Sequence, residues 1–219
     1  MFARLLCLGL AVGLSAAEDT YRIMAVGDSI TQGGGKVFAT YRLPLAAKLR
    51  AAGLRCEFVG SQKTETAAGS LSHEGHGGKN AEFLASILET RLQAHPADVL
   101  LIQAGHNHFA EEKPVPGIVA AHRQMIAIAR RLNPKAIVFI AQVTPSGKLP
   151  KYAYLPELNT ALAGLVKELH RPEQPVYLVD LATGFDVAAD TISDRVHPNE
   201  GGAEKIAQRW AEALQARLK

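Results

Sequence analysis

Two widely separated stretches of the chain carry the residue types that acyl transfer needs. Ser29 follows a short apolar run at residues 23–26, which predicts a buried strand, and Asp194 and His197 stand three residues apart near the other end. An Asp at that spacing can hold the Nδ1–H of the imidazole and leave Nε2 free to act as a base toward a serine hydroxyl. Such triads are recognised by geometry rather than by chain order. The sequence therefore predicts a catalytic triad of Ser29, His197 and Asp194.

Each stretch also has a structural interpretation that involves no catalysis. Asp28 and Ser29 stand close to a run of glycines at residues 33–35, which is ordinary turn chemistry. Asp194 and His197 fit a helix cap and a solvated side chain in front of the last predicted helix. The presence of both stretches in one chain favours the catalytic interpretation.

Apolar patterns predict alternating strands and helices. Short apolar runs predict five strands, at residues 23–26, 56–60, 99–103, 136–142 and 176–180. Helical spacing predicts five helices, at residues 41–52, 81–92, 115–132, 155–170 and 201–218. Polar, glycine-rich residues 61–80 are expected to form a long loop. Because alternation of this kind builds parallel sheets covered on both faces, we expect one three-layer α/β/α domain of the flavodoxin-like kind, with a five-stranded parallel sheet in the order 2-1-3-4-5.

Polar groups follow four of the five predicted strands. Ser29, residues 73–79, residues 105–108 and residues 194–197 come after the first, second, third and fifth strands. The carboxyl ends of parallel strands meet at one edge of a sheet, which is where ligands bind. At that edge the N–H of Ser29, a glycine N–H from residues 73–79 and the side-chain amide of Asn107 can together form an oxyanion hole.

Four sequence blocks, taken together and in order, resemble those of the SGNH (GDSL) hydrolases. They are Gly-Asp-Ser-Ile-Thr at 27–31, the glycine loop at 73–78, Gly-x-Asn at 105–107 and Asp-x-x-His-Pro-Asn at 194–199. The resemblance implies a serine esterase that uses neither a cofactor nor a metal ion. It makes Ser29 the nucleophile, His197 the general base and Asp194 the residue that orients the histidine.

The same resemblance implies which groups hold the oxyanion. They are the N–H of Ser29, the N–H of Gly78 and the side chain of Asn107. Gly75 and Gly77 lie close enough in sequence to stay open as alternatives to Gly78.

Further residues are similar to those of secreted carbohydrate esterases that remove acetyl groups from xylan. They are Tyr41, Arg42 and Leu45, residues 58–61, and the segment His73-Glu74-Gly75-His76-x-Gly78. This branch implies an acetylated sugar or polysaccharide as the substrate, and we expect substrate contacts at Asp28, His76, His106 and His108. Two residues depart from the pattern: His108 stands where the family usually has Asp, and Lys79 where the branch often has an aromatic residue. Both departures bear on the substrate more than on the reaction.

Composition and charge limit the possible binding partners and the cellular location of the protein. Residues 1–17 have the charged start, apolar centre and small-residue end of a signal peptide, so we expect a secreted or periplasmic protein whose single hydrolase domain covers residues 18–219. The formal net charge of +3, lowered by one when Arg4 leaves with the leader, excludes nucleic acid and stable membrane association as inferred partners. Cys56 is then the only cysteine, so no disulfide forms within the chain. We expect a monomer.

A zinc hydrolase is the main alternative that uses the same residues. Five histidines fall in the predicted site loops: His73, His76, His106, His108 and His197. Imidazole is a good zinc ligand. However, the His73-Glu74-x-His76 spacing differs from the helical H-E-x-x-H of zinc hydrolases, and the neighbouring glycines oppose a helix. We therefore expect no metal site.

Two further function classes stay open. One is an inactive relative that only binds carbohydrate, which the complete set of Ser29, Asp194 and His197 argues against. The other is a lysophospholipase or thioesterase of the same superfamily that acts on longer acyl chains. Such substrates need an apolar groove, and the polar site loops offer little toward one. Residues 145–156, which contain Leu149, Tyr152, Tyr154 and Leu155, could supply an apolar wall.

Overall fold

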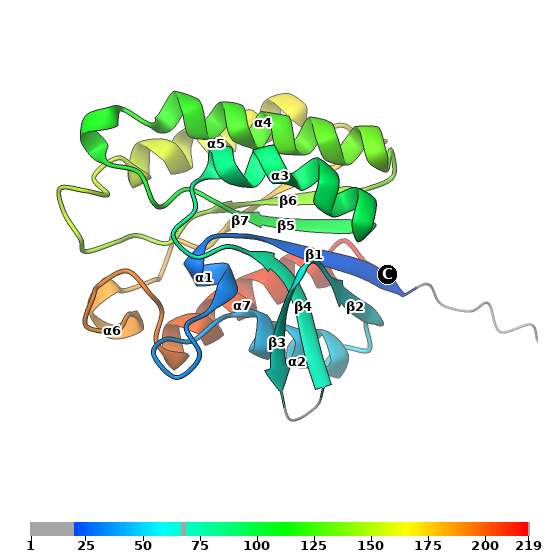
Figure 1. Cartoon of the computed structure of the whole chain (residues 1–219), viewed down its shortest axis with the longest axis horizontal. Helices are drawn as coiled ribbons and strands as arrows, with labels where there is room; N and C mark the ends of the chain where they lie inside the picture. Colours follow the sequence, from blue (N-terminus) through cyan, green and yellow to red (C-terminus); the bar gives the residue numbers. More distant parts are fainter. Residues whose placement is uncertain (1–19, 67–68, 219) are drawn as a thin grey trace, which may run out of the picture.

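The chain folds into a central sheet with helices on both faces (Figure 1). The computed structural model describes residues 20–66 and 69–218, so the expected signal peptide lies outside the described residues. The strands are β1 (Tyr21–Gly27), β2 (Cys56–Val59), β3 (Gln62–Thr66), β4 (Gly69–Gly75), β5 (Val99–Gln103), β6 (Ile137–Gln142) and β7 (Val176–Asp180). The helices are α1 (Ser29–Gln32), α2 (Arg42–Ala51), α3 (Ala81–Ala94), α4 (Val115–Leu132), α5 (Leu155–Leu169), α6 (Val187–Asp190) and α7 (Glu200–Gln215), with a 3-10 turn, η1, at Ala110–Glu112.

The five strands expected from the sequence are present in the expected order. β2, β1, β5, β6 and β7 are parallel neighbours, which is the 2-1-3-4-5 arrangement. All five residues of β5 are buried, as in strands that are covered on both faces. The prediction of a three-layer α/β fold is therefore confirmed, although the sheet has seven strands instead of five.

The two additional strands correct the expectation of a long loop at residues 61–80. β3 and β4 form an antiparallel hairpin, and the end of β4 pairs with the end of β1 through Val26–Glu74 and Gly27–Gly75. β2 pairs with the first half of β1 along the same side of that strand. The hairpin therefore continues the sheet on this side, beyond the point where β2 ends. The sequence pattern misses the hairpin because β3 has no buried residue and only the last three residues of β4 are buried.

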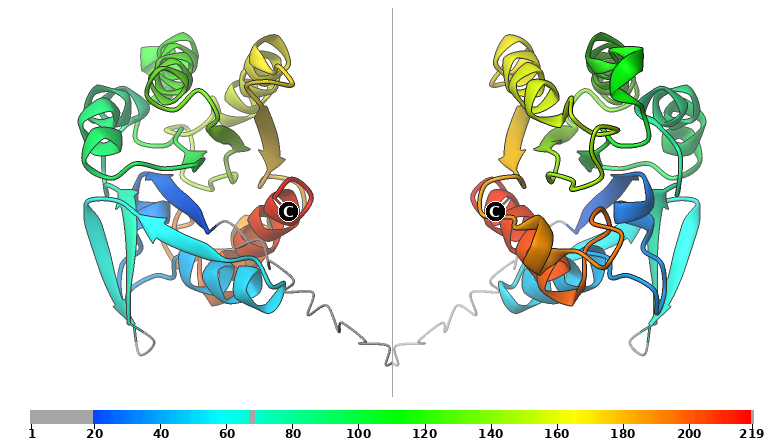
Figure 2. Two further views of the ribbon diagram at one scale, coloured as in Figure 1. Left: turned by 90° about the vertical axis from the view of Figure 1, so that its right-hand side faces the viewer. Right: turned by 90° about the vertical axis from the view of Figure 1, so that its left-hand side faces the viewer.

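Alternate residues of the strands feed two separate cores. Met24 of β1 belongs to the cluster under α3, α4 and α5, whereas its neighbour Ile23 belongs to the cluster under α2 and α7. Figure 2 shows these two groups of helices on opposite faces of the sheet. Among the described residues, no helix has the length and apolar character needed to cross a membrane.

Helix caps fix the loops at the carboxyl edge of the sheet. The Asn80 side chain accepts a hydrogen bond from the N–H of Phe83 and begins α3 directly after the glycine loop. The Asn199 side chain accepts one from the N–H of Gly202 and begins α7 two residues after His197. Each cap satisfies an N–H that the first helical turn leaves unpaired. The site residues before α3 and α7 therefore stand on short segments anchored at a helix start.

Candidate active site

Ser29 begins α1 at the point where β1 leaves the sheet. The Asp28 side chain caps this short helix, with Oδ1 2.9 Å from the N–H of Ile30. The turn requires a glycine at position 27, because a Cβ there would lie 2.2 Å from Oγ1 of Thr31 and 2.6 Å from the carbonyl oxygen of Gln103. Ser29 is therefore held at the carboxyl edge of the sheet, with its N–H in a first helical turn.

A buried arginine fixes the other end of α1. The Arg42 guanidinium donates to the carbonyl of Thr31 at 2.5 Å and to that of Gln32 at 2.8 Å, where the helix dipole favours a positive charge. It also donates to the hydroxyl of Thr64 in β3, at 2.9 Å. Burial of the guanidinium lowers the pKa of Arg42 to about 10, so the group is still charged at neutral pH. Arg42 thus connects α1, the helix that Ser29 begins, to the hairpin.

The structure brings Ser29, His197 and Asp194 into one chain of hydrogen bonds. Oγ of Ser29 lies 2.8 Å from Nε2 of His197, and Nδ1 of His197 lies 2.5 Å from Oδ2 of Asp194. The other carboxylate oxygen of Asp194 accepts the backbone N–H groups of Val196 and His197. Partial burial would raise the pKa of Asp194, but these hydrogen bonds outweigh it and hold the pKa below its ordinary value. A charged Asp194 keeps the proton of His197 on Nδ1.

An aromatic ring that the sequence did not single out packs on the imidazole. Phe38 stacks on His197 with ring centroids 4.1 Å apart and an interplanar angle of 24°. The next residue, Ala39, donates its N–H to the carbonyl of Pro198 at 3.1 Å. Because Phe38 lies in an irregular loop, no apolar periodicity could have indicated this contact.

The three candidate glycines differ in whether their N–H groups are free. The N–H of Gly75 donates to Nδ1 of His73 at 3.0 Å, and the N–H of Gly77 donates to Oε1 of Gln32 at 2.5 Å. The N–H of Gly78 has no hydrogen-bond partner within the described part of the chain. Gly78 has φ +74°, a conformation that glycine adopts without steric cost. Of the three, Gly78 is the one whose N–H is left for a ligand.

Asn107 lies beside this glycine loop. Its Nδ2 donates to the carbonyl of Lys79 at 3.0 Å, which uses one of the two amide hydrogens. Asn107 itself has φ +70°, a conformation that Asn tolerates better than most residues. Tyr154 anchors the same loop by donating its hydroxyl to the carbonyl of Gly105 at 2.7 Å. The second amide hydrogen of Asn107 is therefore available next to Gly78.

Asp28 and His106, two of the four expected substrate contacts, are buried near Ser29. Asp28 is 1% exposed and His106 is 2% exposed, and Oδ2 of Asp28 lies 3.7 Å from Nδ1 of His106. Burial raises the pKa of Asp28 to about 6 and lowers that of His106 to about 4. Their burial favours a role in supporting Ser29. Contact of Asp28 and His106 with a substrate stays a prediction.

His76, the third expected contact, is bound to a buried carboxylate. Oε1 of Glu74 lies 2.6 Å from Nε2 of His76 and 3.2 Å from Nε of Arg91. The N–H and hydroxyl of Ser61 also donate to Glu74. Burial would raise the pKa of Glu74, but these hydrogen bonds outweigh it and lower the pKa. The imidazole of His76 meets the ring of Phe83 edge-on, so this network holds the start of the glycine loop.

His108, the fourth expected contact, lies between two carboxylates. Nε2 of His108 is 2.9 Å from Glu82 in α3, and Nδ1 is 3.4 Å from Glu112 in η1. An Asp at this position would place a third carboxylate between those two. The departure from the usual family residue is thus accompanied by acidic partners on both sides.

The five histidines proposed for a zinc site have separate partners. Within residues 20–66 and 69–218, no group of three or more His, Cys, Asp and Glu side chains is arranged to hold a metal ion. His73 is an example, because Nδ1 accepts the N–H of Gly75, and burial lowers the pKa of His73 to about 3.

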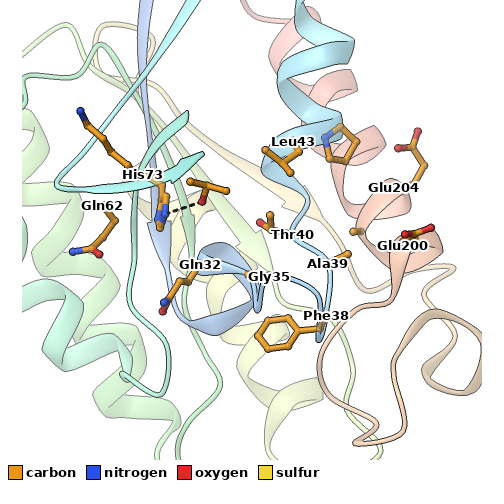
Figure 3. A pocket seen from close by; sticks show the side chains of 15 residues that line it. Gln32, Gly35, Phe38, Ala39, Thr40, Leu43, Gln62, His73, Glu200 and Glu204 are labelled. Atoms are coloured by element: carbon orange, nitrogen blue, oxygen red, sulfur yellow. Dashed lines mark hydrogen bonds between the residues drawn. The ribbon is translucent and has the colours of Figure 1, made fainter. Parts of the chain in front are cut away.

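Two pockets flank the site, one on each face of the sheet. A pocket of about 630 Å³ lies on the α2 and α7 face and includes Gln32 and Phe38 in its wall (Figure 3). A pocket of about 520 Å³ lies on the α5 face, and its wall includes Leu149 and Tyr152. Tyr152 meets the ring of His106 edge-on at 5.3 Å, which connects this pocket to the back of the site. The expected apolar wall at residues 145–156 is therefore present.

Comparison with known proteins agrees with this fold. Residues 25–205 match the model of the GDSL-like lipase/acylhydrolase family. A carbohydrate esterase family 3 structure from Talaromyces cellulolyticus superposes with a TM-score of 0.80 at 26% identity, covering 91% of this chain and 98% of that one. An acetyl esterase mutant determined with an acetate ion gives a TM-score of 0.80 at 25% identity, with the same coverage of both chains.

A curated relative is also an esterase. The multidomain esterase of Ruminococcus flavefaciens is 25% identical over 243 aligned residues, which cover 94% of this chain and 30% of the relative. The chain thus spans less than a third of the length of that protein. Fold and matches together point to one protein family. The chain belongs to the GDSL-like lipase/acylhydrolase family, which confirms the resemblance to SGNH hydrolases.

Proposed function

We propose that the protein removes small acyl groups, acetyl above all, from carbohydrates, with Ser29 as the nucleophile. The observation that carries this proposal is the hydrogen-bond chain from Ser29 Oγ to His197 Nε2 at 2.8 Å and from His197 Nδ1 to Asp194 at 2.5 Å. A serine hydroxyl is a weak nucleophile unless a base takes its proton as it attacks. The distances from His197 to Ser29 and to Asp194 support these roles for His197 and Asp194.

In the first half of the reaction, Oγ of Ser29 attacks the ester carbonyl while its proton passes to Nε2 of His197. The negative charge that develops on the carbonyl oxygen is stabilised by N–H groups of Ser29 and Gly78 and by the amide of Asn107. His197 then donates the proton to the departing alcohol oxygen, the ester C–O bond breaks, and an acyl-serine remains.

In the second half, water attacks the acyl-serine. His197 takes a proton from the water, the same three donors stabilise the second oxyanion, and the proton returns to Oγ of Ser29 as the acid leaves. Asp194 stays charged and stabilises the imidazolium in both halves. The cycle consumes one water and needs no cofactor.

Acetyl as the acyl group and carbohydrate as its carrier have two supports. Structures that superpose with a TM-score of 0.80 include a carbohydrate esterase and an acetyl esterase. The surroundings of Ser29 are polar, since Gly77, Gly78 and Lys79 are exposed on the glycine loop. A long hydrocarbon chain would gain little by lying against such groups.

The apolar pocket supports a second candidate, the hydrolysis of esters with longer acyl chains. Its wall combines Leu149, Tyr152, Ala153 and Leu155, and Leu149 is 67% exposed. An acyl chain in this pocket would bury apolar surface at roughly 25 cal/mol per Å². This candidate uses the same nucleophile and differs only in the substrate.

Hydrolysis of p-nitrophenyl acetate and p-nitrophenyl octanoate tests both candidates. We expect kcat/KM for the acetate to exceed that for the octanoate, and both activities to disappear in Ser29→Ala. Ser86→Ala is the matched control, because Ser86 lies on the surface of α3 and its hydroxyl bonds only within that helix. A preference for octanoate would support the second candidate. Activity that survives in Ser29→Ala would contradict both.

We also propose that the protein is secreted or periplasmic, where polysaccharide esters are found. The proposal rests on the signal-peptide pattern at residues 1–17. Sequencing the N-terminus of the exported protein tests it: a start near residue 18 is expected, and retention of residues 1–17 in the cytoplasm would contradict it.

A further inference from the structure

The 630 Å³ pocket is built by four segments that are far apart in the sequence. Its wall contains the loop after α1, the start of α2, the β3–β4 hairpin and the first turns of α7. Figure 3 shows Gln62 and His73 on one side, Glu200 and Glu204 on the opposite side, and Gln32 and Phe38 at one end. The volume lies within the range of pockets that bind small molecules, about 300–1,000 Å³.

The end formed by Gln32 and Phe38 connects the pocket to the reaction centre. Gln32 closes the helix that Ser29 begins, and its Oε1 accepts the N–H of Gly77. Phe38 stacks on His197. Both residues therefore contact the pocket and the site at the same time.

The pocket wall combines free polar groups with apolar surface. The side chains of Gln62, Lys63 and Glu200 are exposed and make no hydrogen bond or ion pair within the described residues. Between them lie Leu43, which is 39% exposed, and the ring of Phe38. A pyranose ring presents the same combination, with hydroxyl groups around its rim and C–H groups on its faces.

We infer that this pocket is a subsite for a neutral sugar unit that neighbours the acylated unit, so that the enzyme acts on chains in preference to single sugars. This inference rests on the proposed function. The wall carries charges of both signs, with Lys63 on the hairpin and Glu200 on α7, which gives an anionic ligand no net attraction. A hydrocarbon chain would displace the water that hydrogen-bonds to these polar groups and would offer no hydrogen bonds in its place.

The test compares esters that differ in the number of sugar units. Methyl xyloside and methyl glucoside that carry one acetyl group serve as single-unit substrates, and xylo- and cello-trisaccharides that carry one acetyl group and otherwise free hydroxyls serve as chains. We expect the wild-type kcat/KM per ester to be about tenfold higher for at least one trisaccharide, since one or two added hydrogen bonds contribute a factor of this order. The difference should lie mainly in KM.

The double variant Leu43→Ala/Gln62→Ala removes one apolar and one polar wall group, both exposed and neither in the proposed catalytic machinery. We expect it to reduce the advantage of trisaccharides to about twofold or less while hydrolysis of p-nitrophenyl acetate stays within twofold of wild type. Leu149→Ala, in the other pocket, is the matched control and should keep the full advantage. Equal unfolding temperatures would show that all the proteins are folded.

The outcomes separate the subsite from the proposed function. A double variant that keeps the trisaccharide advantage, or a wild type that shows none with either sugar, overturns the subsite even when p-nitrophenyl acetate is cleaved. A wild type that cleaves none of the esters overturns the proposed function and the subsite with it. A double variant that loses activity on p-nitrophenyl acetate as well would mean that these residues support the reaction centre, which also contradicts a separate subsite.

Discussion

The two pockets beside Ser29 differ in the walls that the two faces of the sheet provide. On the α2 and α7 face, exposed polar groups such as Gln62, Lys63 and Glu200 surround the pocket. On the α5 face, Leu149, Tyr152 and their neighbours form a mostly apolar wall. Both pockets adjoin the same carboxyl edge. Under the proposed function, the sheet edge provides the groups for the reaction, whereas the segments on each face decide which part of a substrate can be held there.

The largest effect should come from His197, the proposed base, which every candidate substrate requires. We expect His197→Ala to lower kcat by about 10³-fold to 10⁶-fold for acetate, octanoate and acetylated sugars alike, because all require the same base. His95→Ala is the control, since His95 lies at the far end of α3. A substrate whose hydrolysis survives in His197→Ala would mean that the two pockets serve different reaction centres.

Asn107 should have the next largest effect. We expect Asn107→Ala to lower kcat by about 10²-fold to 10³-fold, with KM little changed, as for other oxyanion-hole donors. Alanine is strained at the φ of +70° found here, so Asn107→Gly, which accepts this backbone conformation, is the matched variant. Both variants should lose the same activity. Full turnover in Asn107→Gly would remove the side chain from the oxyanion hole.

Glu74 lies in β4, the strand by which the hairpin pairs with β1. Its pKa in the folded protein lies below the ordinary 4.5, so the unfolded chain takes up the proton first as the pH falls. The stabilisation is complete above pH 4.5 and disappears as the pH falls through the lowered pKa. We expect Glu74→Gln to lower the free energy of unfolding by about 2 kcal/mol at pH 7.

Urea unfolding of wild type and Glu74→Gln at several pH values measures this effect. The difference between the two proteins should shrink as the pH falls from 7 to below 4. Glu65→Gln is the control, because Glu65 is exposed on the same hairpin. A difference that stays constant with pH would contradict the assignment of a stabilising charged carboxylate to Glu74.

The smallest effect should come from the apolar pocket. We expect Leu149→Ala to lower kcat/KM for p-nitrophenyl octanoate by about threefold to tenfold through lost apolar contact, and to leave the acetate unchanged. Leu43→Ala, on the polar side, should change neither substrate by more than twofold. If octanoate hydrolysis were unchanged in Leu149→Ala but slower in Leu43→Ala, the assignment of the two pockets would be reversed.

The parts of the fold that follow from the sequence are those with a strong apolar pattern. β5 and α4 have the predicted bounds, because β5 is a short run in which every residue is buried and the buried residues of α4 repeat with the period of a helix. The β3–β4 hairpin could not be predicted, because its residues are mostly exposed and its pairing with β1 depends on the space left by β2. The part of the wall of the 630 Å³ pocket that the hairpin forms could therefore not be predicted either.

The same limit applies to the site. Residue types and order were enough to single out Ser29, Asp194 and His197, because each carries its own chemistry. The choice among glycines 75, 77 and 78 was not possible from the sequence, since it depends on the side chains of His73 and Gln32 that occupy the first two N–H groups. The stacking of Phe38 on His197 likewise depends on how a loop without periodicity folds.

Covalent labelling tests the central claim most directly. The wild-type protein is treated with a p-nitrophenyl phosphonate, which traps an activated serine, and the adduct is located by mass spectrometry of its peptides. A single adduct on Ser29, formed with loss of activity toward both acetate and octanoate and absent from His197→Ala, is the predicted result. An adduct on another residue, or full esterase activity after complete labelling of Ser29, would contradict it.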